Sequence, residues 1–253
     1  GTLDLKVGQE FNSINGREIC KKYYKKLPRG SQQEKQARLL DSIVDSRLAP
    51  EHFDTAHLLR NVDKLKLDDY IAVTVKLHGT SARYYNTLTH RKLNWYEKLL
   101  LKFGVKVERE EYSYVCASRR VIKSVNFRTL DGKKHFYDFD IWSHVGEQHL
   151  KDKLGKSEAV YCEIVGRDYA GAEIQSGYSY GYGVPQVYVY RISHISPQGI
   201  EVDLPYHQMR ERAIQLGLNV CPEVFYGKLK DFLIKWAPLD TTLSSSARDV
   251  EQA

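Results

Sequence analysis

Lys76 has the residue type and the surroundings of a nucleophile. The apolar residues around it alternate with smaller or polar ones, as in a strand with one buried face: Ile71, Val73, Val75 and Leu77. Gly79 interrupts this pattern and predicts a tight turn into a second strand over 81–86. Partial burial beside the turn would favour the free amine of Lys76, which is its nucleophilic form. The alternative is a surface lysine on a half-exposed strand.

Three later segments carry polar or aromatic groups on predicted strands. Arg119 and Arg120 are adjacent in a predicted strand over 112–122, so only one of them can face a given pocket. Glu163 lies in an apolar strand over 160–166, and a buried carboxylate there requires a partner. A structural salt bridge to an arginine would also satisfy it. Tyr190 lies in a strand over 187–192.

Together these segments resemble a known family. Lys76-Leu77-His78-Gly79-Thr80 is similar to the Lys-x-x-Gly motif of covalent nucleotidyltransferases, and more narrowly to Lys-x-His-Gly-Thr of the ATP-dependent RNA ligases. Residues 116–120, the segment around Glu163 and the segment around Tyr190 resemble later segments of that family, in the family's order. The resemblance covers roughly residues 67–226.

The resemblance implies a fold and a set of roles. The fold is a nucleotidyltransferase fold of mixed α/β (α+β) class, with two antiparallel sheets flanked by helices and the nucleotide between them. Lys76 would become adenylated, and the expected nucleotide-binding residues are Leu77, Ser81, Arg119, Glu163 and Tyr190. Tyr190 would stack on adenine, Glu163 would accept hydrogen bonds from the ribose, and Arg119 would contact phosphate. Arg83 and Arg120 are expected nucleic-acid contacts, and Arg120 is also the alternate to Arg119. Arg191 replaces the aspartate that usually follows the stacking ring.

The implied activity is ATP-dependent RNA ligation with Mg²⁺ or Mn²⁺. Lys76 would take AMP from ATP, pass it to an RNA 5′-phosphate, and allow a 3′-hydroxyl to seal the strand. A DNA ligase or a GTP-using capping enzyme is one alternative. A degenerate nucleotide- or RNA-binding module without turnover is another, because the family's later Glu-Gly-x-Val and Lys-x-Lys motifs are not found in order. Lys228-Leu229-Lys230 imitates the second motif but falls in a predicted helix. We therefore identify no metal ligand in this chain and expect the domain to be incomplete at its C-terminus.

Composition sets broad limits. The 253 residues carry a net charge of +6 and 18 tyrosines, which suits a polyanionic partner such as single-stranded nucleic acid. Four widely spaced cysteines predict neither a zinc site nor a disulfide framework, and Cys116 and Cys162 are expected as buried thiols. No apolar run approaches the ~18 residues of a membrane span, and no signal peptide opens the chain. We expect a monomer in the cytoplasm or another reducing compartment, with no membrane partner.

Periodicity predicts a mainly helical extension over 1–66, followed by the ligase-like domain over 67–253. The extension contains a basic patch over 21–29, a helix capped at Ser31 and a second helix ending near Lys64. Helices are also expected over 94–103, 143–154, 206–216 and 228–236. The helix over 94–103 has an apolar face (Trp95, Leu99, Leu100 and Phe103) and several nearby lysines. Packing against the domain is the simpler interpretation of it, and a clamp on nucleic acid is the alternative. The loop over 167–183 could lie near substrate.

Overall fold

The computed structural model describes residues 13–14, 17–18, 38–40, 42–53, 55–129 and 140–236. The chain divides into two compact units. One comprises 1–34, 54–71 and 227–253, and the other comprises 35–53 and 72–226. The expected basic patch over 21–29, Cys20 and the helix cap at Ser31 lie outside the described residues.

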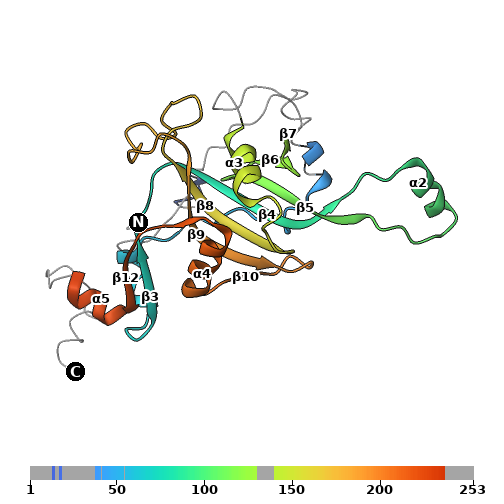
Figure 1. The fold of residues 1–253 in the computed structure, drawn as a ribbon. Coiled ribbons are helices and arrows are strands. Elements are labelled where there is room, and N and C mark those ends of the chain that lie inside the picture. The colour runs from blue at the N-terminus through green and yellow to red at the C-terminus, as the bar shows by residue number, and fades with distance from the viewer. Residues whose placement is uncertain are drawn as a thin grey trace. The chain divides into compact units, whose positions relative to one another are not determined.

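The larger unit is built on one eight-stranded sheet (Figure 1). Its strands run in the spatial order β10, β9, β8, β4, β5, β6 and β7, all antiparallel, and β11 pairs with β9 in parallel. The strands are β4 (Thr80–His90), β5 (Glu110–Ser118), β6 (Ile122–Val125), β7 (Arg128–Thr129), β8 (Glu158–Val165), β9 (Gln186–Ile195), β10 (Glu201–Asp203) and β11 (Asn219–Val220). The mixed α/β class with antiparallel sheets that the sequence predicted is confirmed.

Helices cover one face of this sheet. α3 (Ile141–Leu150) packs on β4, β5 and β6, and α4 (Tyr206–Leu216) packs on β9 and β11. α3 begins two residues earlier than predicted because the Asp140 carboxylate accepts the Ser143 backbone N–H at 3.2 Å and caps the helix. It ends at Leu150, short of the predicted Leu154.

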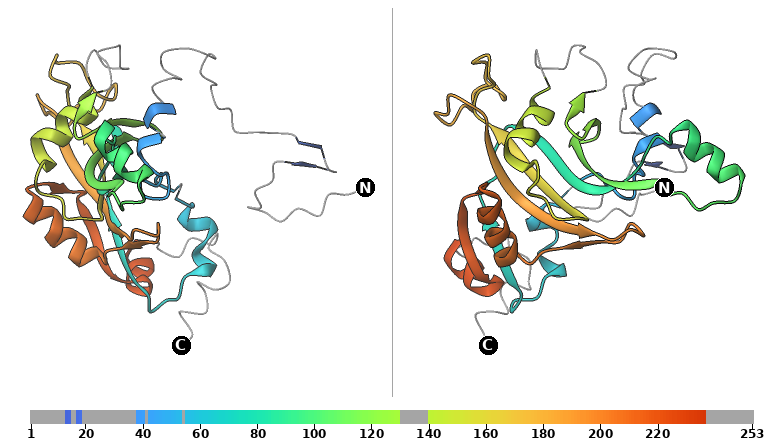
Figure 2. Two further views of the ribbon diagram at one scale, coloured as in Figure 1. Left: turned by 90° about the vertical axis from the view of Figure 1, so that its right-hand side faces the viewer. Right: turned by 45° about the vertical axis from the view of Figure 1, so that its right-hand side comes forward.

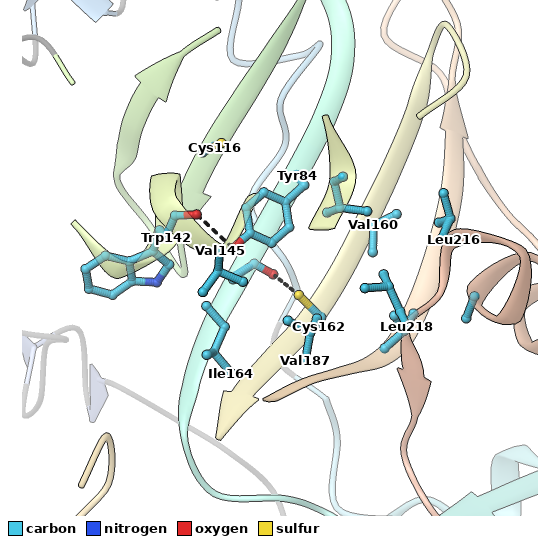
Figure 3. Packing of buried hydrophobic residues seen from close by; sticks show 14 of the residues in the cluster. Tyr84, Cys116, Trp142, Val145, Val160, Cys162, Ile164, Val187, Leu216 and Leu218 are labelled. Atoms are coloured by element: carbon cyan, nitrogen blue, oxygen red, sulfur yellow. Dashed lines mark hydrogen bonds between the residues drawn. The ribbon is translucent and has the colours of Figure 1, made fainter. Parts of the chain in front are cut away.

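The core between helices and sheet is apolar (Figure 3). Tyr84 of β4 is 1% exposed and donates its hydroxyl to the Trp142 carbonyl at 2.9 Å. Cys116 and Cys162 are buried among these residues as predicted, and burial raises the pKa of both thiols. Fully burying an aliphatic or aromatic side chain stabilises the fold by roughly 1.5–3 kcal/mol, so this face holds the sheet to its helices.

A second, smaller apolar cluster lies on the opposite face of the sheet. Val44, Leu48 and Ala49 from the N-terminal part of the unit pack there against Tyr85 and Tyr161. Residues 38–40 and 42–43 are helical, as the predicted periodicity of Leu39, Leu40, Ile43 and Val44 requires. Side chains at alternate positions of β4 thus reach two different environments.

The strands β4 and β5 continue into an arm that carries α2 (Trp95–Lys102) at its tip (Figure 2). The predicted helix boundaries are confirmed. Asn94 is the N-cap, its backbone N–H donates to Glu97 Oε2 at 2.8 Å, and Gly104 follows the helix with φ +76°.

The smaller unit contains short elements. η1 (Leu58–Arg60) and η2 (Val62–Lys64) are 3₁₀ turns, so the predicted second helix ending near Lys64 is wrong. Phe53, Ala56 and Leu58 are exposed, and without a buried face a short helix gains little stability. β1 (Ser13–Ile14) pairs with β2 (Arg17–Glu18).

The last described elements are β12 (Glu223–Lys228), which pairs with β3 (Tyr70–Thr74), and α5 (Leu229–Trp236). α5 confirms the predicted helix over 228–236 to within one residue. Lys228 and Lys230 were expected in one helix. Lys228 is instead the last residue of β12, and both lysines reach Asp68, at 3.0 and 3.3 Å.

Candidate functional site

Lys76 lies in a loop between β3 and β4. The predicted strand over 69–78 ends early, at Thr74, and Val75 donates its N–H to the Pro222 carbonyl at 2.9 Å instead of continuing a ladder with the next strand. Lys76 is exposed, so the expected partial burial of its amine is not found. Leu77, the next residue, is half-buried. The loop therefore presents the lysine to solvent while its neighbour anchors the chain.

Gly79 holds this loop against β8. Its N–H donates to Glu163 Oε1 at 2.9 Å. A Cβ at position 79 would collide with the Ile164 carbonyl oxygen and would lie 2.9 Å from Val165 Cγ1. Only glycine allows so close an approach between the loop and the neighbouring strand. The turn glycine and the strand glutamate, 84 residues apart in sequence, thus form one structural unit.

Glu163 is a half-buried carboxyl with a perturbed pKa. Burial raises its pKa from 4.5 to about 7. The hydrogen bond from Gly79 and the positive charges of Lys76 and Arg119 act in the opposite direction and lower it. A carboxyl that titrates near neutrality beside a lysine is a common feature of functional sites.

Ser81 and Tyr190 lie on the same sheet face as Glu163. Ser81 and Glu163 are direct partners in the β4–β8 ladder, and Ser81 Oγ lies 3.3 Å from Tyr190 Oη. Burial raises the pKa of the Tyr190 phenol above its ordinary value. The predicted residues Ser81, Glu163 and Tyr190 are therefore brought together by three neighbouring strands.

Arg119 and Arg120 do not lie on a strand, contrary to prediction. β5 ends at Ser118, whose N–H donates to the Val121 carbonyl at 2.9 Å, and this turn leads into β6. Both arginines are exposed in the turn. The alternating-face argument for choosing between them therefore does not apply. The charge of Arg119 lowers the pKa of both Glu163 and His52, which indicates that it faces the site.

Arg83 is a structural residue. It is 1% exposed, and its guanidinium donates to the backbone carbonyls of Ser118 at 2.8 Å and Pro50 at 2.6 Å. The expectation that Arg83 contacts nucleic acid is not carried forward, because a side chain so enclosed offers no surface to RNA. Its role is to tie β4 to the N-terminal part of the unit.

Arg191 is also structural. Its guanidinium lies 4.4 Å from the Tyr161 ring centroid and 4.7 Å from that of Phe53. It pairs with Glu201 at 3.0 Å and Asp203 at 2.7 Å. The arginine that replaces the family's aspartate is thus neutralised by carboxylates of β10.

Three residues near the site were not identified from the sequence. The His52 ring lies 5.1 Å from that of Tyr190, and burial lowers the pKa of His52. Tyr180 Oη accepts the His78 N–H at 2.8 Å, and the Tyr178 ring lies 4.6 Å from that of His78. His52 belongs to a segment without any resemblance to the family. The tyrosines belong to the loop over 167–183, which had been expected near substrate only as a whole.

Two classes of feature are not found in the described part of the chain. No group of three His, Cys, Asp or Glu side chains there is arranged to hold a metal ion. None of the described helices has both the length and the apolar character that crossing a membrane requires.

Comparisons with known proteins gave a family match and similar solved structures. A family model described as RNA ligase matches residues 69–250. No curated protein matches the chain. Two solved point mutants of Naegleria gruberi RNA ligase are similar at 13% identity over 74% of this chain, one in the apo form with a TM-score of 0.44 and one with ATP and Mn with a TM-score of 0.45. This chain covers 45% and 46% of those two chains, so it spans about half of their length.

Proposed function

Because this chain belongs to the RNA ligase family, we propose that it seals RNA by way of an adenylate on Lys76. The observation that carries the proposal is the contact between Gly79 and Glu163, which joins the Lys76 loop to the strand that holds the half-buried carboxyl. Ser81 and Tyr190 extend the same face of the sheet. Lys76, Glu163, Ser81 and Tyr190 thus supply, in that order, a nucleophile, a hydrogen-bond acceptor, a hydroxyl and an aromatic ring around one position.

The first step transfers AMP to the protein. The free amine of Lys76 attacks the α-phosphorus of ATP, a P–N bond forms, the bond to pyrophosphate breaks, and the amine loses a proton to solvent. Exposure of Lys76 gives ATP access to the amine. Glu163 would accept from the ribose hydroxyls, the Tyr190 ring would stack on adenine, and Arg119 would offset phosphate charge.

The second and third steps involve RNA. An oxygen of the RNA 5′-phosphate attacks the adenylate phosphorus, the P–N bond breaks, and the lysine nitrogen takes up a proton from solvent. A 3′-hydroxyl then attacks the 5′-phosphate and loses its proton to solvent, the new phosphodiester forms, and AMP leaves. Since no metal-holding cluster is found among the described residues, we assign no metal ligand. Mg²⁺ or Mn²⁺ would accompany ATP on its phosphates and offset their charge.

The test is labelling of the full protein with ATP that carries a radioactive α-phosphate, in the presence of Mg²⁺. We expect an acid-labile protein adduct that disappears in Lys76→Ala and persists in Lys151→Ala, a matched variant of an exposed lysine at the C-terminal end of α3. An adduct that persists in Lys76→Ala contradicts the assignment. Labelling with GTP instead of ATP would favour a capping enzyme, and sealing of DNA nicks in preference to RNA would favour a DNA ligase. ATP binding without any adduct would favour a binding module.

A further inference from the structure

The helix α2 lies at the tip of the β4–β5 arm (Figures 1 and 2). Its apolar side chains are exposed. Trp95 is 78% exposed and Phe103 is 76% exposed. Tyr96, Leu99 and Leu100 are exposed as well. The interpretation of this segment as a helix packed against the domain is therefore wrong for the part of the chain that the structure describes. Large apolar groups gathered on one exposed element commonly mark a binding surface.

The side of α2 that faces the arm is held in place by hydrogen bonds and burial. Glu97 is buried, and it accepts from Arg91 Nη2 at 2.6 Å and from the Asn94 backbone N–H at 2.8 Å. Leu101, four residues later on the same side, is half-buried. The helix is thus held to its arm by one side, which fixes the opposite sides toward solvent.

The exposed sides combine aromatic and basic groups. Trp95, Lys98, Leu99 and Lys102 follow the i, i+3, i+4, i+7 spacing of a single helical stripe. Between Arg91 and Arg109 the arm carries six basic and two acidic side chains, which leaves a net charge of +4 in 19 residues, whereas the whole chain carries +6. Positive charge is therefore concentrated on this arm.

We propose that this surface, made of Trp95, Lys98, Leu99, Lys102 and Phe103, binds single-stranded RNA at a distance from the Lys76 site. Exposed rings can stack on successive bases while neighbouring lysines neutralise phosphates. Unpaired bases are required, because a duplex hides the faces on which the rings would stack. The choice of RNA among polyanions rests on the proposed function. A protein partner fits less well, because lysine is depleted in the buried centres of protein interfaces.

The arm also sets a length for the bound strand. β4 has 11 residues, and at about 3.3 Å per residue its ends lie up to roughly 33 Å apart. A stacked strand advances about 3.4 Å per nucleotide, so roughly 10 nucleotides separate the end held near Lys76 from α2. Short RNA should therefore bind without this surface, and longer RNA should gain affinity from it.

The experiment measures binding of 5′-phosphorylated RNA of about 5 and about 20 nucleotides to the full protein by fluorescence anisotropy. In Trp95→Ala/Phe103→Ala we expect roughly 5- to 100-fold weaker binding of the long RNA, from the loss of base stacking. Binding of the short RNA should not change. The matched control is Ile200→Ala/Val202→Ala, which removes two exposed apolar residues elsewhere and should leave both affinities at the wild-type value.

A second variant tests the charges. In Lys98→Ala/Lys102→Ala we expect the slope of log affinity against log salt to fall by about 1.4, since each phosphate contact to a single strand contributes about 0.7. Lys151→Ala/Lys156→Ala should keep the wild-type slope. Thermal unfolding of each variant checks that it remains folded, as expected for exposed positions.

Three results would overturn the proposal. The first is an unchanged affinity for long RNA in both α2 variants. The second is an equal loss of affinity for short and long RNA. The third is a wild-type dimer that RNA does not dissociate and that the Trp95→Ala/Phe103→Ala variant does not form. The last would make the surface an interface between two copies of the chain. Adenylate labelling of the wild type without RNA is scored separately, so loss of that activity would refute the proposed catalysis and leave the RNA result standing.

Discussion

The two faces of the eight-stranded sheet use the same strands for different purposes. On β4, Ala82 and Tyr84 point into the apolar core under α3 and α4. Ser81 and Tyr85, at the intervening positions, lie on the face that holds Glu163 and Tyr190. One face is closed by helices, and the other presents hydroxyl, carboxyl and aromatic groups around an exposed lysine. Changes on the first face should therefore act mainly on stability, and changes on the second mainly on adenylate formation.

A pair of glycines gives the largest expected contrast between the faces. Gly79→Ala would push the Lys76 loop away from β8 because the new Cβ meets the Ile164 carbonyl. A misplacement of about 1 Å can cost roughly 100-fold in rate, and we expect adenylate formation to fall by at least that factor.

Gly146→Ala is the counterpart on the helix-covered face. Its Cβ would lie 2.6 Å from Tyr84 Cε1 and 3.0 Å from Cys116 Sγ. Overpacking of this kind costs about 1–3 kcal/mol in the free energy of unfolding. Urea unfolding and adenylate labelling of both variants check the contrast. Wild-type adenylate labelling of the Gly79→Ala variant would contradict the expected contrast between the two faces.

Glu163 predicts a pH dependence of stability. Its pKa is about 7 in the folded protein against an ordinary value of 4.5, so the folded state binds this proton more tightly than the unfolded state. The stabilisation from this group is complete below about pH 4.5 and is lost as the pH rises toward 7. Because one pKa unit corresponds to about 1.4 kcal/mol, this shift gives an expected loss on the order of 3 kcal/mol.

The measurement is urea unfolding between pH 4.5 and 7.5. Glu163→Gln should lack this component, so its stability relative to wild type should improve as the pH rises. Glu211→Gln, at an exposed position of α4, should follow the wild type across the range. Parallel curves for wild type and Glu163→Gln would show that the carboxyl does not titrate in this window.

Two tyrosines give the smallest contrast. Tyr190→Phe keeps the ring and loses only the 3.3 Å contact with Ser81, so the affinity for ATP should change by less than about threefold. Tyr190→Leu should weaken ATP binding more, because the ring that stacks on adenine is lost. Tyr84→Phe removes the 2.9 Å hydrogen bond from the buried Tyr84 hydroxyl to the Trp142 carbonyl and should cost about 0.5–1.5 kcal/mol of stability. Calorimetric titration with ATP measures the affinity of the Tyr190 variants, and urea unfolding measures the stability of Tyr84→Phe. Equal losses for Tyr190→Phe and Tyr190→Leu would contradict stacking as the role of the ring.

The sequence predicted the elements whose signals are local. The strands expected over 81–86, 160–166 and 187–192 correspond to parts of β4, β8 and β9, whereas the alternating strand over 69–78 ends early, at Thr74. The Asn94 cap and Gly104 bounded α2, and the family resemblance led to Ser81, Glu163 and Tyr190. The exposure of α2 could not be predicted, because an apolar stripe has the same pattern whether or not a partner covers it.

Contacts between distant segments could not be predicted from the sequence either. His52 meets Tyr190 across 138 positions, and Tyr180 meets His78 across 102, with no local pattern to mark either pair. At the turn that contains Arg119, the backbone N–H and the hydroxyl of Ser118 both donate to the Val121 carbonyl. A run of apolar residues on both sides of that turn reads as one continuous strand.

The most direct test of the account is the location of the adenylate. The wild-type protein is incubated with ATP and Mg²⁺, digested, and its peptides are mapped by mass spectrometry under conditions that preserve the P–N bond. The account predicts AMP on the side chain of Lys76, and no adenylated peptide from the Lys76→Ala protein. AMP on another residue, or an unmodified wild type that still seals RNA, would contradict it.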